Sequence, residues 1–173
     1  MPDARLLVWR MNSGSVFSFL IVSHCNMLAT YLLDTMPFRS GADGLILKAQ
    51  TEQNEDRAIK MFELDSKEKL KRFRNEVAIA ELLSPFPGIV SVFESFQSRG
   101  YGYMVMNLAE QDLMDFIETV EHISEEDALF IFEEICEAVK TLHSFGIAHL
   151  DIKPENILIS KEGPLLCDFA NST

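Results

Sequence analysis

The sequence predicts an α+β fold, in which a small antiparallel β-sheet lobe with one helix precedes a mainly α-helical lobe. Short apolar or β-branched runs, separated by turn residues, fill the chain from about residue 29 to residue 107. In the second half, apolar residues recur every three or four positions, as on one face of a helix. We therefore expect one lobe over residues 29–106, a second over 113–173 and a junction at 107–112, after an N-terminal extension over 1–28.

The first lobe is expected to contain one helix among its strands. Residues 66–83 carry apolar side chains at helical spacing and end before two prolines and a glycine at 85–88. Lysines and arginines line the other side of this helix, which we interpret as a solvated face. The strands are expected at Ala29–Leu33, Gly44–Ala49, Arg57–Phe62, Val90–Phe96 and Tyr101–Asn107.

The second lobe opens with a short amphipathic helix that begins at Leu113. Ser124, with Asp127 three residues later, resembles a capping box and predicts a longer helix through about Phe145. The apolar face of that helix is expected to contain Leu129, Phe132, Ile135, Cys136, Val139 and Leu142. Residues 147–173 alternate short apolar pieces with dense polar groups.

Composition excludes several classes of function. The net charge of −12 argues against binding of a nucleic-acid backbone, which requires an excess of cations. The three cysteines, Cys25, Cys136 and Cys167, are far apart and form no C-x-x-C pair, so neither a disulfide framework nor a zinc site is expected. A reducing, cytoplasmic location is the simplest interpretation.

A run without charged residues extends from Met11 to Leu33, through the end of the N-terminal extension and the first expected strand. A signal peptide or a membrane anchor is one interpretation of this run. However, polar residues interrupt it, and its densest apolar stretch, Val16–Val22, is too short to span a bilayer. We therefore favour an extension that either packs on the domain or forms a poorly ordered tail.

The strongest chemical signal is the string from His149 to Asn156, His-Leu-Asp-Ile-Lys-Pro-Glu-Asn, followed by Asp168-Phe169-Ala170. It places a carboxylate, an ammonium group and a carboxamide within six positions of one loop. Aspartate and asparagine oxygens suit Mg²⁺, which prefers hard oxygen ligands. Such a set fits phosphoryl transfer, in which positioning and charge stabilisation supply most of the catalysis.

This H-x-D-x-K-P-x-N string, followed by the D-F-x motif, resembles the catalytic loop of eukaryotic protein kinases. The lysine at 153 corresponds to the serine/threonine form, and the whole string is most similar to the calcium/calmodulin-dependent group. The resemblance implies that Asp151 is the catalytic base and that Lys153 neutralises the transferring phosphoryl group. It also implies that Asn156 and Asp168 hold Mg²⁺ and that the substrate is a protein with a serine or threonine acceptor.

The resemblance extends upstream to the ATP-binding residues. Ala58-Ile59-Lys60 is similar to the V-A-I-K strand, so Lys60 is expected to hold the α- and β-phosphates. Glu76 is expected to pair with Lys60, with Glu81 as the competing candidate. The resemblance implies further nucleotide contacts. Gly41 and Gly44 would cover the phosphates, and Ile46, Ala58 and Leu158 would pack against adenine, with Met106 behind it. The hinge backbone from Asn107 to Ala109 would bond adenine, and Asp112 would contact the ribose.

Several positions depart from the family pattern, and three of them bear directly on the function. Arg39 replaces the first glycine of the Gly-rich loop, which should leave the loop bulkier and less flexible. Leu150 replaces the arginine that receives an activation-loop phosphate, so that form of switching should be absent. Ala170 replaces the glycine of D-F-G, and its methyl group restricts positive φ.

A kinase domain continues well beyond the D-F-G position, whereas this sequence ends at Thr173. The resemblance therefore implies a partial kinase domain whose helical lobe is incomplete. It leaves three hypotheses open: an active serine/threonine kinase, a pseudokinase that binds ATP or protein without catalysis, and a fragment that does not fold stably alone.

Overall fold

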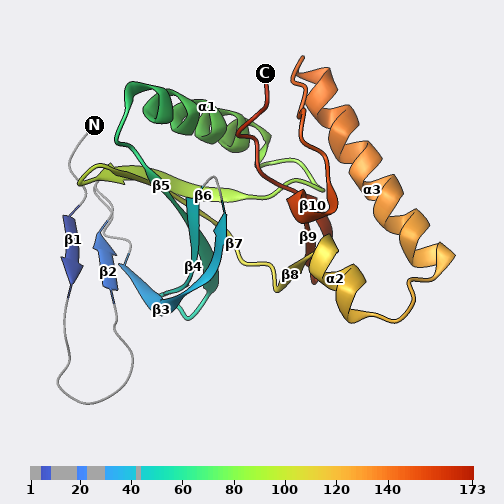
Figure 1. Ribbon diagram of the computed structural model, residues 1–173, viewed down its shortest axis with the longest axis horizontal. Coiled ribbons are helices and arrows are strands. Elements are labelled where there is room, and N and C mark those ends of the chain that lie inside the picture. Colours follow the sequence, from blue (N-terminus) through green and yellow to red (C-terminus); the bar gives the residue numbers. More distant parts are fainter. Residues whose placement is uncertain (1–4, 9–18, 23–29, 42–43) are drawn as a thin grey trace. The chain divides into compact units, whose positions relative to one another are not determined.

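The computed structural model describes residues 5–8, 19–22, 30–41 and 44–173, which divide into two compact units (Figure 1). Of these described residues, unit 1 contains those up to Phe73 together with Val92–Leu108, and unit 2 contains Arg74–Ser91 and Ala109–Thr173. The α+β class predicted from the sequence is confirmed. Among the described residues, no helix is both long and apolar enough to cross a membrane.

Within the described part of unit 1, seven strands form one antiparallel sheet in the order β1-β2-β3-β4-β5-β7-β6 (Figure 1). Their bounds are Arg5–Val8 (β1), Phe19–Val22 (β2), Thr30–Gly41 (β3), Gly44–Thr51 (β4), Asp56–Glu63 (β5), Val92–Ser98 (β6) and Tyr101–Asn107 (β7). The predicted bounds of β7 are confirmed, while β6 begins and ends two residues later than predicted.

The N-terminal half of this sheet departs most from the predictions. β1 and β2 come from the predicted extension and join the sheet through β3. The strand predicted at Ala29–Leu33 is also too short, since β3 continues to Gly41, although Ala29 itself lies outside the described residues. The register shifts on both sides of Pro37, which lacks a backbone N–H, and this irregularity lets the strand continue past the proline.

Alternation along β4, β5 and β7 produces a core on one face of the sheet. Ile59 and Val105 are fully buried and pair directly across β5 and β7. Their cluster contains Tyr31, Leu33, Ala49, Ile59, Tyr103 and Val105, with Leu47, Met61 and Phe96 against it.

Helix α1 (Lys67–Leu83) begins in unit 1 and continues into unit 2, within one residue of the prediction. In unit 1, Phe73 is buried and its ring lies 5.0 Å, centroid to centroid, from that of Phe62. A Cβ at Gly102 on β7 would come within 2.7 Å of the Phe73 ring, so glycine is required for this close approach.

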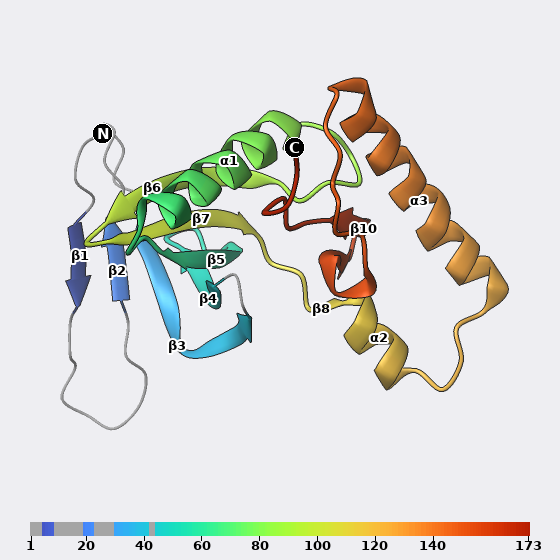
Figure 2. The same cartoon turned by 45° about the horizontal axis from the view of Figure 1, so that its top comes forward.

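Unit 2 contains α2 (Leu113–Thr119) and α3 (Glu125–Ser144), near the predicted positions (Figure 2). The predicted capping box is confirmed: Ser124 Oγ accepts from the Asp127 N–H at 3.0 Å and donates to Asp127 Oδ2 at 2.6 Å. The predicted apolar face of α3 is buried at Ile135 and Leu142, but Leu129 and Phe132 are exposed.

Among the described residues of unit 2, three short strands form a second antiparallel sheet in the order β10-β9-β8. They are Gln111–Asp112 (β8), Ile157–Ser160 (β9) and Gly163–Leu166 (β10), with the 3-10 turn η1 (Pro154–Asn156) before β9. Hydrogen bonds between Leu166 and both Gly88 and Val90 tie β10 to the segment after α1. This sheet places residues 151–156 and 167–170 at the ends of its strands.

Candidate active site

The register of unit 1 brings four predicted nucleotide-binding residues onto one face of the sheet. Lys60 pairs with Ile46 of β4, and Ala58 pairs with Met106 of β7. Because directly paired residues, and residues two apart on a strand, point to the same side, these four side chains share the face opposite Ile59 and Val105. Lys48 of β4 pairs with Ala58 and therefore lies on the same face, so this face carries the cations Lys48 and Lys60 beside the apolar side chains of Ile46, Ala58 and Met106.

Lys60 is 7% exposed, which is unusual for a lysine. Its Nζ lies 5.0 Å from the centroid of the Phe62 ring, within reach of a cation–π contact. The stem is thus packed along the sheet and the ammonium is held near a defined point. A buried, positioned cation is suited to bind an anionic group.

The two glycines predicted over the phosphates pair with each other across the β3–β4 hairpin, while Ala42 and Asp43 lie outside the described residues. Gly44 has φ +138°, and a Cβ there would lie 2.4 Å from the carbonyl oxygen of Met61. Sheet packing therefore requires glycine at position 44. The phosphate-binding role of Gly41 and Gly44 stays a prediction.

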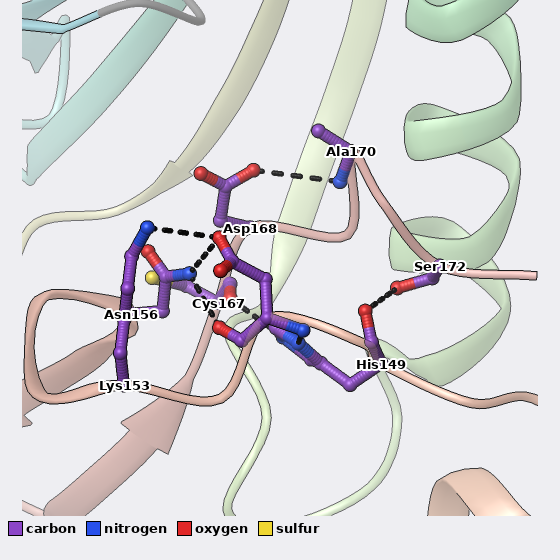
Figure 3. Close-up of polar contacts among 8 residues, drawn as sticks. His149, Lys153, Asn156, Cys167, Asp168, Ala170 and Ser172 are labelled. Atoms are coloured by element: carbon purple, nitrogen blue, oxygen red, sulfur yellow. Dashed lines mark hydrogen bonds and ion pairs between the residues drawn. The ribbon is translucent and has the colours of Figure 1, made fainter.

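In unit 2, two of the predicted loop residues, Lys153 and Asn156, both contact the third, Asp151 (Figure 3). Lys153 Nζ lies 2.9 Å from Asp151 Oδ2. Asn156 Nδ2 donates to the same oxygen at 3.0 Å and to the Asp151 backbone carbonyl at 2.8 Å. The Asp151 carboxylate is therefore held in one orientation by a cation and an amide.

These contacts control the ionisation of the loop. The hydrogen bond from Lys153, aided by the one from Asn156, lowers the pKa of Asp151 below its ordinary value. The Asp151 carboxylate in turn raises the pKa of Lys153, with smaller contributions from Glu155 and Asp168. At neutral pH, Asp151 is an anion that accepts hydrogen bonds, and Lys153 is a cation.

His149 and Cys167 connect this loop to Asp168. The His149 ring is buried and donates from Nε2 to the Cys167 carbonyl at 3.0 Å, while Nδ1 accepts from the Asp151 N–H at 3.2 Å. The Cys167 N–H donates to the Asn156 carbonyl at 3.0 Å. His149 therefore has a structural role, and these bonds fix Asn156 and Asp168 within the same unit.

The backbone of the loop is left-handed at two residues other than glycine, Leu150 (φ 64°) and Asp168 (φ 66°). Such conformations are costly for L-residues and persist where the surroundings over-determine them. Ala170 is not among the described residues with positive φ. The missing glycine of D-F-G is therefore not required by the backbone conformation at position 170.

Asn156 and Asp168 supply the oxygen chemistry that a magnesium ion needs. Both amide hydrogens of Asn156 bind Asp151, so Oδ1 is the atom that Asn156 can offer a cation. Among the described residues, no group of three or more histidine, cysteine or acidic side chains could hold a metal. A pair of oxygen ligands nevertheless fits Mg²⁺, which binds few protein groups and takes further oxygens from phosphates and water.

The remaining predicted site residues lie outside the 149–156 loop. Glu76 is buried on the unit 2 part of α1, and Lys60 belongs to unit 1, so their pairing stays a prediction. Asp112 is buried and its Oδ1 accepts from the Asp115 N–H at 2.8 Å as the N-cap of α2. The ribose contact predicted for Asp112 therefore competes with a structural role. Ala109 is buried and Leu158 is partly exposed.

Sequence reasoning missed two residues near this loop, Ser172 and Asn75. Ser172 Oγ donates to the His149 carbonyl at 3.2 Å, and Asn75 Nδ2 donates to the Ser172 carbonyl at 3.2 Å. Both bonds join residues far apart in the sequence, and neither position stands out by type or spacing. Local patterns carry no signal for them.

Comparison with known proteins gives one family and several relatives. Residues 39–173 match the model of the protein kinase domain. A calcium-dependent protein kinase 24 from Arabidopsis thaliana is 39% identical over 102 residues, 55% of this chain and 18% of its own length. The serine/threonine-protein kinase PTK2/STK2 of Saccharomyces cerevisiae is 32% identical over 155 residues, 80% of this chain and 19% of its own length.

A third relative is the serine/threonine-protein kinase CBK1 of Yarrowia lipolytica, which is 39% identical over 114 residues, 64% of this chain and 19% of its own length. This chain thus spans about a fifth or less of the length of each of these three relatives. The similarity includes the loop from His149 to Asn156 and Asp168, since the family match reaches residue 173.

Proposed function

This chain belongs to the protein kinase domain family, and from that premise we propose that it transfers the γ-phosphoryl group of ATP to serine or threonine of a protein substrate. The observation that carries the proposal is the Asp151 carboxylate, held by Lys153 at 2.9 Å and by Asn156 at 3.0 Å. A carboxylate in a fixed orientation can position a hydroxyl group and accept its proton.

In the proposed reaction, the acceptor hydroxyl donates a hydrogen bond to Asp151. Its oxygen forms a bond to the γ-phosphorus as the bond to the ADP oxygen breaks, and its proton passes to the carboxylate. The lowered pKa of Asp151 keeps it ionised before the reaction, so it is always available as an acceptor at neutral pH. Lys153 lies close enough to neutralise charge on the transferring group.

The roles in nucleotide binding follow the resemblance, residue by residue. Lys60, oriented by Glu76, would hold the phosphates beneath the hairpin of Gly41 and Gly44. Adenine would bond to the 107–109 backbone and lie between Ile46, Ala58 and Leu158. Asn156 and Asp168 would hold Mg²⁺, which supplies charge neutralisation of the phosphates when bound. An intracellular, reducing compartment is part of this proposal, because ATP and free thiols such as Cys136 coexist there.

The test is phosphate transfer from radiolabelled Mg–ATP to a mixture of serine- and threonine-containing peptides by the purified chain. Asp151→Asn should lower the rate by about 10²–10⁴-fold, because it removes the proton acceptor while keeping the shape. Glu155→Gln is the matched control, since Glu155 is an exposed acid of the same loop, and it should leave the rate unchanged.

Two other outcomes would contradict the proposal. Saturable Mg–ATP binding without transfer by the wild-type chain would favour a nucleotide-binding protein without catalysis. An unchanged rate in Asp151→Asn would show that another group accepts the proton.

A further inference from the structure

Ser172 fastens the segment after Asp168 to two other parts of unit 2. Its side chain is 3% exposed, and Oγ donates to the His149 carbonyl at 3.2 Å (Figure 3). Its own carbonyl accepts from Asn75 Nδ2 at 3.2 Å, and its N–H donates to the Phe169 carbonyl at 3.1 Å. We call Asn75, His149 and Ser172, with the bonds that join them, the Ser172 clasp.

Each part joined by the clasp carries a residue of the proposed reaction. Asn75 directly precedes Glu76 on α1, His149 lies two residues before Asp151, and Ser172 lies four residues after Asp168. We propose that Ser172 is a positioning residue, which holds Asp151 and Asp168 in the arrangement needed for metal-dependent nucleotide binding. This inference rests on the proposed function.

The strained backbone explains why this hydroxyl matters. The His149 carbonyl belongs to the peptide that leads into Leu150, the residue with φ 64°. The hydrogen bond from Ser172 therefore holds the peptide plane at the start of the left-handed turn before Asp151. If Leu150 relaxed to the negative φ that L-residues prefer, the His149 carbonyl would change direction, and the Asp151 N–H would move away from His149 Nδ1.

The backbone next to Ser172 completes this arrangement. Ala148 and Thr173 exchange two hydrogen bonds, at 3.0 Å from the Ala148 N–H and 3.1 Å from the Thr173 N–H. These bonds bring the segment beside His149 but do not orient the His149 carbonyl. The Ser172 hydroxyl therefore links the position of residues 172–173 to the backbone conformation of residues 149–151.

The first experiment measures amide hydrogen exchange and needs no ligand. Ser172→Ala should speed exchange of the Asp151 and Ala148 amides about three- to tenfold, the loss expected for one buried hydrogen bond. The Leu158 amide in β9 serves as an internal reference and should not change. Thr173→Ala is the matched control, because Thr173 is exposed and keeps its backbone bonds, and it should exchange like the wild type.

Unchanged exchange at Asp151 and Ala148 in Ser172→Ala would overturn the proposal. If Ser172→Ala does not fold, Asn75→Ala takes its place, since this exposed side chain makes the other side-chain bond of the clasp. Faster exchange at the two amides in Asn75→Ala would support the clasp, and wild-type exchange would overturn it.

The second experiment separates positioning from general stability by calorimetric titration with Mg–ATP and with adenosine. Ser172→Ala should raise the Kd for Mg–ATP about threefold or more, while the Kd for adenosine, which needs no metal ligand, stays unchanged. Ser172→Thr, which keeps the hydroxyl, should restore the affinity for Mg–ATP. An equal rise in the Kd for Mg–ATP and the Kd for adenosine would show a merely structural role and overturn the proposal.

If the wild-type chain binds no Mg–ATP, the proposed function fails. The exchange experiment then decides separately whether the Ser172 clasp holds the loop.

Discussion

The Nζ atom of Lys153 lies 2.9 Å from Oδ2 of Asp151, two residues earlier in the same loop. The two side chains are 44% and 30% exposed, so water screens the pair and its contribution to stability is small. Its consequence is chemical: each group stabilises the charged form of the other. The loop therefore presents a fixed anion beside a fixed cation at neutral pH.

Lys153→Met should raise the pKa of Asp151 toward the ordinary carboxyl value of about 3.9. The pKa is lowered in the folded state, so the interaction stabilises the fold above the ordinary carboxyl pKa and is lost as the pH falls through the folded value. A titration of the Asp151 carboxyl carbon by NMR would measure the shift. Lys161→Met, at an exposed lysine, should leave that titration unchanged, and an unshifted pKa in Lys153→Met would contradict the assignment.

Gly44→Ala should destabilise the chain by about 2 kcal/mol or more, because the backbone there suits glycine alone and the new Cβ meets the Met61 carbonyl. Gly100→Ala is the matched control, with φ +82° and no atom within 4 Å of the new Cβ. It should cost about 1 kcal/mol, the backbone penalty alone. Urea unfolding of the three proteins would compare them, and equal losses would show that the Met61 contact is unimportant.

Helix boundaries were predictable from the sequence because their signals are local. Ser124 and Asp127 marked the start of α3, and the two prolines and a glycine at 85–88 marked the end of α1. β9 and β10 were missed because each has four residues, too few to show an alternating pattern. β1 and β2 were missed because each also has four residues, and their place in the sheet depends on pairing of β1 with β2 and of β2 with β3.

The residue types of the candidate site could be predicted from the sequence, but the geometry of the site could not. The spacing of Asp151, Lys153 and Asn156 along one short loop is enough to bring them together. The bonds from His149 to Cys167 and from Ser172 to His149 span 18 and 23 residues, and they depend on how β9 and β10 return the chain to the loop. Such contacts follow from the folded chain and not from local sequence patterns.

Tyr31→Phe should lower the free energy of unfolding by about 1–2 kcal/mol, since the Tyr31 hydroxyl donates to a carboxylate oxygen of Glu94 and this bond would be lost. Burial, then the hydrogen bond and charge of Glu94, raise the pKa of Tyr31 above its ordinary value. The unfolded state therefore loses this proton first, and the wild type should lose stability as the pH rises above about 10.

Denaturant unfolding of both proteins between about pH 8 and pH 11, a range that spans the ordinary tyrosine pKa, would test this. Tyr101→Phe is the control, because Tyr101 is exposed, and it should follow the wild type. A gap between the wild type and Tyr31→Phe that does not narrow with rising pH would contradict the assignment.

Leu150→Gly and Ala170→Gly should change stability in opposite directions. Leu150 has φ 64° and its side chain is 66% exposed, so glycine removes backbone strain and gives up little packing. We expect a gain of about 0.5–1 kcal/mol in the free energy of unfolding. Ala170 is not among the described residues with positive φ, so glycine there adds freedom to the unfolded chain and should cost about 0.5–1 kcal/mol. Urea unfolding measures both, and a stabilising Ala170→Gly would show that position 170 needs the left-handed backbone that glycine allows.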